Sequence, residues 1–219
     1  LYSVAEAAFY ARVPTVTMAR WLYGSGKGAR VLRPQLYDSE EKFVTFLDFV
    51  QALAIREVRL GYGASLQKIR EGIGRAQKTY KVDYPLARQH RMYLVGKELH
   101  IRLDDDDLVQ VTGRYANQRR MIPVVAVYMK DIGFNAEGLA SNYLAFQWQG
   151  RNISMDPQFR FGEPMLRTAG YSARALWEAC KAEGGYEPAA RAFGVAPDDV
   201  EAAFRYHNSL LLVNKKKAA

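Results

Sequence analysis

The stretch Ser3-Val4-Ala5-Glu6-Ala7-Ala8, followed by Arg12-Val13-Pro14-Thr15-Val16-Thr17-Met18-Ala19-Arg20-Trp21, decides the fold at the start of this 219-residue chain. Ser3 and Glu6 have the spacing of a capping box, in which each side chain satisfies a free backbone N–H of the other residue. Pro14 ends the first helix because proline restricts the residue before it to extended conformations. Thr15 can then cap a second helix that ends near Gly24, so the stretch predicts a helix-turn-helix.

The next residues along the chain predict a wing and two longer helices. Gly24–Gly28 is a flexible loop, and Ala29–Pro34 is expected to be extended, as in a β-wing with outward arginines. Apolar residues then recur at three- and four-residue steps over Phe43–Leu60 and Ser65–Tyr80, which is typical of amphipathic helices.

The rest of the chain mixes strands with helices. Arg91–Val95 and Glu98–Leu103 are predicted to form a hairpin, and Asn142–Gln149 is predicted to be a strand because aromatic residues dominate it. Three helices are expected at the end, over the ranges Ala173–Ala182, Pro188–Phe193 and Pro197–His207. The predicted fold class is α+β and mainly helical, with an N-terminal winged helix-turn-helix, a β-containing middle and a C-terminal three-helix domain. The corresponding boundaries are 1–88, 89–152 and 153–213, followed by a basic tail over 214–219.

Positive charge is concentrated in the first half of the chain. Residues 1–102 hold 17 Lys and Arg against 9 Asp and Glu, whereas residues 103–219 hold 14 of each. A basic half joined to a neutral half indicates that the first half meets a polyanion and the second meets another kind of partner. The alternative is a solvated surface with a chance excess of lysine and arginine.

The second helix of the predicted helix-turn-helix has a polar face suited to the major groove of DNA. Short hydroxyls can reach phosphates there, and an arginine can donate two hydrogen bonds to a guanine edge. The candidate DNA-binding residues are Arg12, Thr15, Thr17, Arg20, Lys27, Arg30 and Arg33.

Signals for an enzyme, a cofactor or a metal are missing from the sequence. The three histidines are far apart, Asp104–Asp107 lacks the alternating oxygens of a calcium loop, and no phosphate-binding glycine motif is present. We therefore expect no catalytic activity, no cofactor and no metal. No apolar run is long enough to span a membrane, and the single cysteine, Cys180, favours a reducing, cytoplasmic setting.

The first 35 residues resemble the winged helix-turn-helix of the MerR family of transcription regulators, through Ser3–Ala8 and Val13–Trp21. This resemblance implies binding to double-stranded DNA. Residues Ser65–Pro85 are similar to the segment that comes after this motif in such folds. The metal-sensing cysteines of some MerR regulators have no counterpart in this chain.

The carboxyl-terminal part resembles the small helical domain of VapB-type antitoxins. The resemblance rests on Ile153–Leu166, which reads ISMDPQFRFGEPML, and on Asp198–Tyr206. It implies an antitoxin that neutralises a PIN-type ribonuclease toxin and represses its own operon. A dimer is expected, since two reading helices match a palindromic operator.

A protein partner is expected at the end of the chain, because acidic residues crowd the start of the last helix and would repel phosphates. Val200, Ala203 and Phe204 form the predicted protein interface. Two other interpretations remain open. One is a MerR-like regulator responding to a small ligand in an aromatic pocket, and the other is an interaction scaffold without a DNA role. The pocket would be lined by Tyr143, Phe146, Trp148, Phe159 and Phe161.

Overall fold

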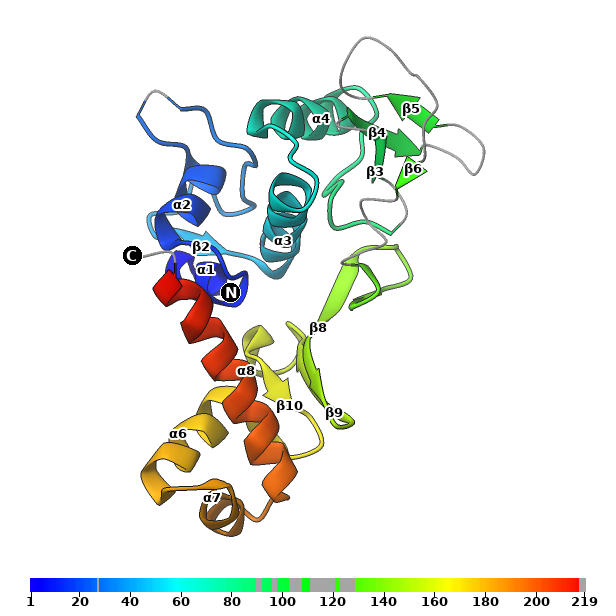
Figure 1. Ribbon diagram of the computed structural model, residues 1–219. Coiled ribbons are helices and arrows are strands. Elements are labelled where there is room, and N and C mark those ends of the chain that lie inside the picture. Colours follow the sequence, from blue (N-terminus) through cyan, green and yellow to red (C-terminus); the bar gives the residue numbers. More distant parts are fainter. Residues whose placement is uncertain are drawn as a thin grey trace. The chain divides into compact units, whose positions relative to one another are not determined.

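The chain folds into two compact units, Leu1–Ala140 and Ser141–Ala219 (Figure 1). The computed structural model describes residues 1–26, 28–89, 92–95, 98–102, 108–110, 121–122 and 129–216. The architecture mixes helix and sheet, in agreement with the predicted class. The division after Ala140 differs from the predicted boundaries at 88 and 152, because the long strand β8 (Ala140–Trp148) pairs with strands of the C-terminal unit.

The N-terminal unit begins with the predicted pair of helices, α1 (Val4–Tyr10) and α2 (Thr15–Tyr23), which pack on each other. The capping box is confirmed. The Ser3 backbone N–H donates to Glu6 Oε2 at 2.8 Å, and the Glu6 backbone N–H donates to Ser3 Oγ at 3.2 Å. Thr15 does not cap α2, since Pro14 occupies the N-cap position and Thr15 is the first helical residue.

A second capping box starts α3 (Phe46–Leu60), where Thr45 and Asp48 bind each other's backbone N–H groups. Before it, β2 (Phe43–Val44) pairs antiparallel with β1 (Tyr2–Ser3), so the predicted helix begins three residues later than expected. The helix α4 (Leu66–Lys78) comes next and is capped by Ser65.

The middle of the chain adds a small antiparallel sheet with strand order β5-β4-β3-β6. Its strands are β3 (Met92–Val95), β4 (Glu98–Arg102), β5 (Leu108–Gln110) and β6 (Met121–Ile122). The predicted hairpin is confirmed, because β3 pairs with β4 from Met92↔Ile101 to Val95↔Glu98. The helix α4 packs against β4. The short strand β7 (Ile132–Phe134) follows in the chain and belongs to the other sheet, where it is the neighbour of β8.

The C-terminal unit combines a sheet with three helices. The strands β8, β9 (Arg151–Met155), β10 (Met165–Leu166) and β11 (Tyr171–Ser172) are neighbours in that order and pair antiparallel. A 3-10 turn, η1 (Arg160–Gly162), connects β9 to β10. Residues 153–172 are therefore mostly strand and turn, so the predicted helical domain contains half of a sheet.

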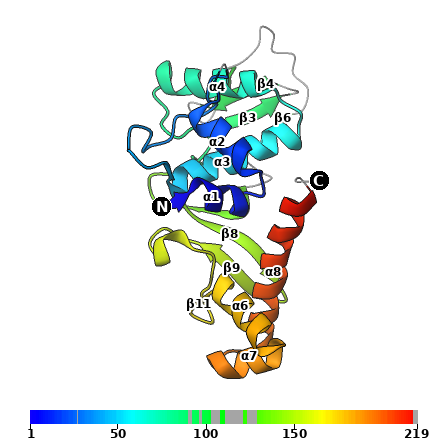
Figure 2. The same cartoon turned by 90° about the vertical axis from the view of Figure 1, so that its left-hand side faces the viewer.

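The three predicted C-terminal helices are present as α6 (Ala173–Glu183), α7 (Tyr186–Phe193) and α8 (Pro197–Lys216). Gly184 and Gly194 end the first two in the left-handed conformation that glycine adopts without strain. Figure 2 shows α8 running beside α6, in keeping with their extensive packing, and α8 also packs on β9. Within the described residues, no helix is long and apolar enough to cross a membrane.

Candidate functional site

The turn of the helix-turn-helix is held from a distant helix. Arg12 lies in the turn with a φ of +58°, and the Val13 N–H donates to the Ala8 carbonyl at 3.0 Å. Arg56 of α3 donates a hydrogen bond from Nη1 to the Ala11 carbonyl at 3.0 Å. The Arg56 guanidinium thus joins α3 to the turn between α1 and α2 through a neutral backbone carbonyl.

The helix α2 separates an apolar face from a polar face. Met18, Trp21 and Leu22 are buried, whereas Thr15 and Arg20 are exposed and Thr17 is half-buried. Among the described residues, the Arg20 side chain makes no hydrogen bond or ion pair. The predicted reading face of α2 is therefore available to an external ligand.

The loop after α2 is not the predicted wing. Within its described residues no strand forms over 29–34, and Ser25 and Gly28 make only an isolated bridge. The backbone groups that a strand would pair are used elsewhere. The N–H groups of Val31 and Leu32 donate to the Trp21 carbonyl at 2.7 and 3.0 Å. The extended wing expected from the sequence is thus replaced by a loop folded onto the end of α2.

Arg70 of α4 holds the same loop from the other side. Its Nε donates to the Arg30 carbonyl at 2.6 Å and its Nη2 donates to the Ala29 carbonyl at 2.7 Å. Hydrogen bonds from a charged donor are stronger than those between neutral groups. Arg70 therefore fixes the backbone that carries Arg30.

Cations and aromatic rings alternate along the loop in a series that we call the cation–aromatic ladder. Tyr23 and Tyr37 stack with ring centroids 6.0 Å apart and planes at 19°. The Lys42 ammonium lies 5.3 Å from the Tyr23 ring, and the guanidinium carbons of Arg30 and Arg33 lie 4.6 and 5.1 Å from the Tyr37 ring. Each such contact contributes about 0.5–1 kcal/mol at an exposed site. The ladder orders three cations beside α2.

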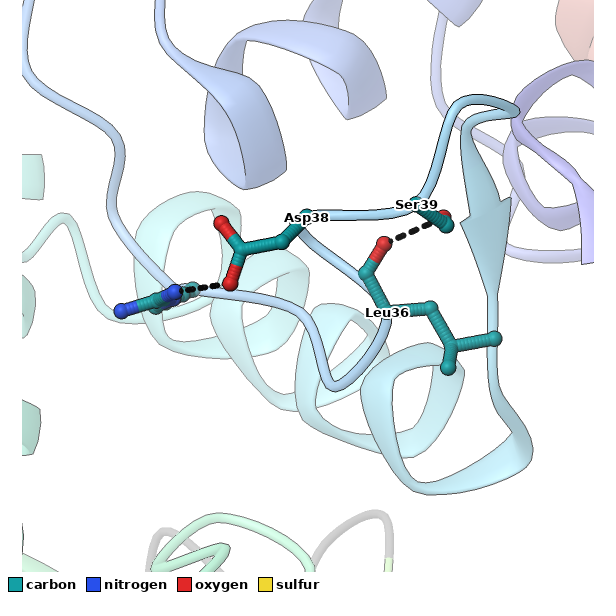
Figure 3. Close-up of polar contacts among 4 residues, drawn as sticks. Leu36, Asp38 and Ser39 are labelled. Carbon is teal, nitrogen blue, oxygen red and sulfur yellow. Dashed lines mark hydrogen bonds and ion pairs between the residues drawn. The ribbon is translucent and has the colours of Figure 1, made fainter.

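The two arginines of the ladder differ in their charge balance. Arg33 forms an ion pair with Asp38 at 2.5 Å, and Figure 3 shows the Asp38 carboxylate in this contact, beside the hydrogen bond from the Ser39 hydroxyl to the Leu36 carbonyl. Arg30 has no carboxylate partner among the described residues. Arg33 is therefore a weaker candidate for a phosphate contact than Arg30.

Of the remaining predicted DNA-binding residues, Arg12 is half-buried in the turn, and Lys27 lies outside the described residues. Sequence reasoning missed Lys42, because its charge is next to Glu40 and Glu41 and the segment reads as balanced. Only the fold places Lys42 on the Tyr23 ring.

A buried carboxylate ties the loop to α3. Asp48 is fully buried, and its Oδ2 accepts hydrogen bonds from the Gln35 N–H at 3.0 Å and from the Thr45 hydroxyl at 2.9 Å. Burial raises the pKa of Asp48 above its usual value, and the hydrogen bonds only partly oppose this. The Tyr23 hydroxyl donates to the Phe43 carbonyl at 2.9 Å, and burial, together with Asp48, raises the pKa of Tyr23. The base of the ladder is thus rigid.

Two of the three residues of the predicted protein interface are buried. Val200 and Ala203 are completely buried on α8, which packs against α6, α7 and β9. Phe204 is half-buried and its ring meets Tyr186 edge-on, with centroids 5.6 Å apart. The spacing of apolar residues correctly identified one apolar face of α8, but this face is part of the core of the C-terminal unit.

The acidic residues at the start of α8 are also used internally. Asp199 is buried, its Oδ2 accepts the Ala196 N–H at 3.3 Å, and its Oδ1 lies 3.2 Å from Arg151 Nε of β9. The more exposed Asp198 lies 3.9 Å from Arg151 Nη2. These carboxylates cap the helix and join it to the sheet.

The aromatic residues of the alternative ligand pocket do not gather. The Phe146 ring packs on Tyr206 at 5.8 Å, and the Trp148 ring lies beneath the Arg205 guanidinium at 4.0 Å. Phe159 and Phe161 are exposed, on the connection between β9 and β10. Two of these side chains thus pack within the unit and two are exposed, which does not favour a common ligand pocket.

No cluster of three or more metal-ligating side chains occurs in the described residues. Cys180 is buried, and burial raises the pKa of its thiol. His207 stacks on Trp177 with ring centroids 4.1 Å apart, and burial lowers its pKa. Neither residue has the surroundings of a catalytic group.

No protein-family model matches the chain. A protein of Mycobacterium tuberculosis (strain ATCC 25618 / H37Rv) named "Putative antitoxin VapB45" is 25% identical over 227 residues, which cover 93% of this chain and 92% of that protein. The X-ray crystal structure of Rv2018 from Mycobacterium tuberculosis superposes with a TM-score of 0.63 and 20% identity, covering 92% of this chain and 96% of that chain. The similarity thus extends over both units, and the structural likeness shows a shared fold.

Proposed function

We propose that this chain is the antitoxin of a toxin–antitoxin pair, which binds operator DNA through its N-terminal unit and a PIN-type ribonuclease toxin through its C-terminal unit. The observation that carries the proposal is the similarity to a protein named as an antitoxin, which extends over 93% of the chain. A similarity confined to one unit would support only one of the two activities.

The N-terminal geometry supports the DNA-binding half of the proposal. Arg20 projects from α2 without an internal partner among the described residues, and the hydroxyls of Thr15 and Thr17 lie on the same helix. Arg30 and Lys42 of the cation–aromatic ladder flank the helix as phosphate contacts. A helix with one bidentate donor and neighbouring cations has the elements of major-groove recognition.

The cations expected to contact phosphates make the interaction depend on salt. Neutralising roughly four to six phosphates per subunit makes affinity fall steeply as salt rises, because condensed counterions are released on binding. A homodimer would place two α2 helices on a palindromic operator. In this proposal the chain acts as a repressor of its own operon in the cytoplasm and has no enzymatic activity.

Co-expression with the adjacent reading frame tests the toxin half. We expect a small nuclease to arrest growth when expressed alone, and growth to be restored when this chain is present. The two proteins should co-purify as a complex of defined size. Growth arrest that this chain does not relieve, with no complex on sizing, would refute the antitoxin proposal.

A gel-shift titration against the DNA upstream of the gene tests the second half. We expect a shift that weakens as salt increases and that is stronger than the shift with unrelated DNA of equal length. Equal affinity for both DNAs would leave only a sequence-independent interaction and contradict the operator proposal.

A further inference from the structure

The connection between β9 and β10 carries a strained backbone that presents an aromatic ring to solvent. Three consecutive residues have positive φ: Arg160 at +46°, Phe161 at +58° and Gly162 at +86°. Residues other than glycine are uncommon in this region, and a bulky side chain there is an outlier. We call Phe159–Gly162 the knuckle.

Hydrogen bonds hold the knuckle in this conformation. The Phe159 N–H donates to the Asp156 carbonyl, the Gly162 N–H donates to the Phe159 carbonyl, both at 2.9 Å, and the Glu163 N–H donates to the Arg160 carbonyl at 3.1 Å. The Gln158 N–H donates to the Asp156 carboxylate at 2.9 Å. The knuckle is therefore a defined structure and its shape exists before any partner binds.

The ring that this backbone displays is not used by the unit itself. Phe161 is 81% exposed, more than the other large hydrophobic side chains of the described residues. Phe159 is 47% exposed and is covered in part by the Arg167 guanidinium, whose carbon lies 4.3 Å from the ring centroid. Within the unit, the strain at Phe161 is not offset by burial of its side chain. Strain that persists without a local structural gain is found mainly at functional sites.

The charges around the knuckle indicate the kind of partner. Arg160 is exposed and Arg167 has a side chain that is 56% exposed, whereas its partner Asp156, at 3.8 Å, is largely buried. Both cations are more exposed than the nearby carboxylates, the largely buried Asp156 and the half-buried Glu163, so the surface favours an acidic partner. An apolar pocket with carboxylates at its rim complements the exposed Phe161 ring, with Arg160 next to it in sequence and the Arg167 guanidinium on the neighbouring Phe159 ring.

We propose that the knuckle is the anchor through which the C-terminal unit binds its toxin, with the Phe161 ring inserted into an apolar pocket and Arg160 and Arg167 facing acidic residues at the rim of that pocket. This proposal rests on the proposed antitoxin function and adds the contact surface to it. A preformed aromatic anchor loses little conformational freedom on binding, which is typical of the residues that dominate interface energetics. The surface replaces the buried face of Val200 and Ala203 as the site of toxin contact.

The variant Phe161→Asn separates binding from folding. Asparagine tolerates the left-handed region, so this substitution relieves strain while it removes the ring. We expect the melting temperature of the variant to equal or exceed that of the wild type. We also expect its Kd for the purified product of the adjacent reading frame to rise by roughly 30-fold, the effect of removing a hot-spot residue.

Leu212→Asn is the matched control, since Leu212 is an apolar residue of the same unit and is 61% exposed. It should leave the Kd within about threefold of wild type, because isolated exposed apolar residues carry little binding energy. Arg160→Glu should weaken binding by roughly tenfold at low salt and by less at high salt, as expected for a rim charge.

Several results would overturn the anchor. Suppose that the wild type binds the protein encoded by the adjacent reading frame. If the Kd of Phe161→Asn for that protein is then within about threefold of the wild-type Kd, the anchor proposal is wrong and the antitoxin function stands. If wild type does not bind that protein, both proposals fail. Sedimentation of the full chain with vesicles of anionic phospholipid, lost in Phe161→Asn, would assign the knuckle to a membrane surface instead.

Discussion

Arginines are used differently in the two units of this protein. In the N-terminal unit Arg59, Arg70 and Arg88 donate hydrogen bonds to backbone carbonyls, and Arg56 does so while also lying 3.8 Å from Glu57. Arg33 is the exception that pairs with a carboxylate there, that of Asp38. In the C-terminal unit Arg151, Arg167, Arg174 and Arg205 pair with carboxylates. A carbonyl is neutral, so an arginine that binds one keeps its net charge, whereas a carboxylate cancels it. The charge asymmetry of the sequence therefore reflects two ways of stabilising loops and helices.

This contrast shows why the excess charge of the first half is not simply a DNA-binding surface. Residues 1–140 contain 21 Lys and Arg against 15 Asp and Glu, and residues 141–219 contain 10 against 8. Some of the N-terminal cations hold the loop and turn, and others, such as Arg20, project from the surface. The structural arginines contribute a positive field while the projecting ones supply contacts.

The largest effect is expected from Arg70→Met, which tests the arginines that donate hydrogen bonds to backbone carbonyls. It removes two charge-assisted hydrogen bonds and leaves the carbonyls of Ala29 and Arg30 without that donor, so we expect a loss of about 2–3 kcal/mol in the free energy of unfolding. Urea denaturation followed by tryptophan fluorescence measures this.

An arginine that forms an ion pair with a carboxylate supplies the control for that experiment. Arg205→Met breaks an exposed i,i+4 pair with Glu201 and should cost only about 0.5 kcal/mol of pairing energy, with a similar amount for its contact with the Trp148 ring. Equal losses for the Arg70 and Arg205 variants would remove the distinction between the units.

A projecting arginine should act on binding and not on folding. We expect Arg20→Ala to weaken operator binding by about 1–3 kcal/mol while the melting temperature stays unchanged, because the side chain has no internal partner among the described residues. Arg191→Ala, an exposed arginine of the C-terminal unit, is the control and should bind DNA like the wild type. Unchanged affinity of the Arg20 variant in a gel-shift titration would exclude α2 as the reading helix.

The two units should respond to pH in opposite directions, and Asp48 determines the response of the first. Because its pKa is raised in the folded state, the folded chain binds more protons than the unfolded chain between the two pKa values. Stability is therefore lost as pH rises from about 4 through the folded pKa. Asp48→Asn stays uncharged, so its stability relative to wild type should increase with pH in urea titrations. A constant difference between the two proteins would argue that Asp48 titrates normally.

His207 should produce the smaller, opposite response in the C-terminal unit. Burial is the largest cause of the lowered pKa of His207, and the charges of Arg174 and Lys181 lower this pKa further. As pH falls, His207 is therefore protonated at a higher pH in the unfolded chain than in the folded chain. Stability is retained above about pH 6.5 and is lost as pH falls below it. We expect His207→Gln to abolish this loss between about pH 7 and pH 5, measured by tryptophan fluorescence in denaturant. An unchanged acid response in the variant would assign it to another group.

Helices were predictable from the sequence because their determinants are local. Ser3 and Glu6 are three residues apart, Gly184 and Gly194 come directly after the helices that they end, and apolar spacing identifies α3 and α4 without knowledge of the fold. The polar face of α2 was predicted for the same reason. Its buried partners Met18 and Trp21 are one turn apart.

The loop after α2 and the partner surface could not be predicted in this way. The loop conformation depends on Arg70, 40 residues from Arg30, and the ladder depends on Tyr23 meeting Tyr37. The spacing of apolar residues in α8 is the same whether this face packs within its own unit or against a partner, so the sequence does not distinguish the two. Only the packing of α8 against α6, α7 and β9 within the folded unit shows that Val200 and Ala203 are covered internally.

The amino-acid sequence alone determined the helices, their caps, the hairpin and the uneven charge, since these depend on residues within a few positions of each other or on composition. The tertiary structure decided which cations are free to bind, which apolar residues are core, and that Phe161 is displayed on a strained turn. The first two properties depend on contacts between distant residues, such as Arg56 with Ala11 and Arg151 with Asp199. The display of Phe161 rests on local hydrogen bonds and on exposure, which is defined only after the chain has folded.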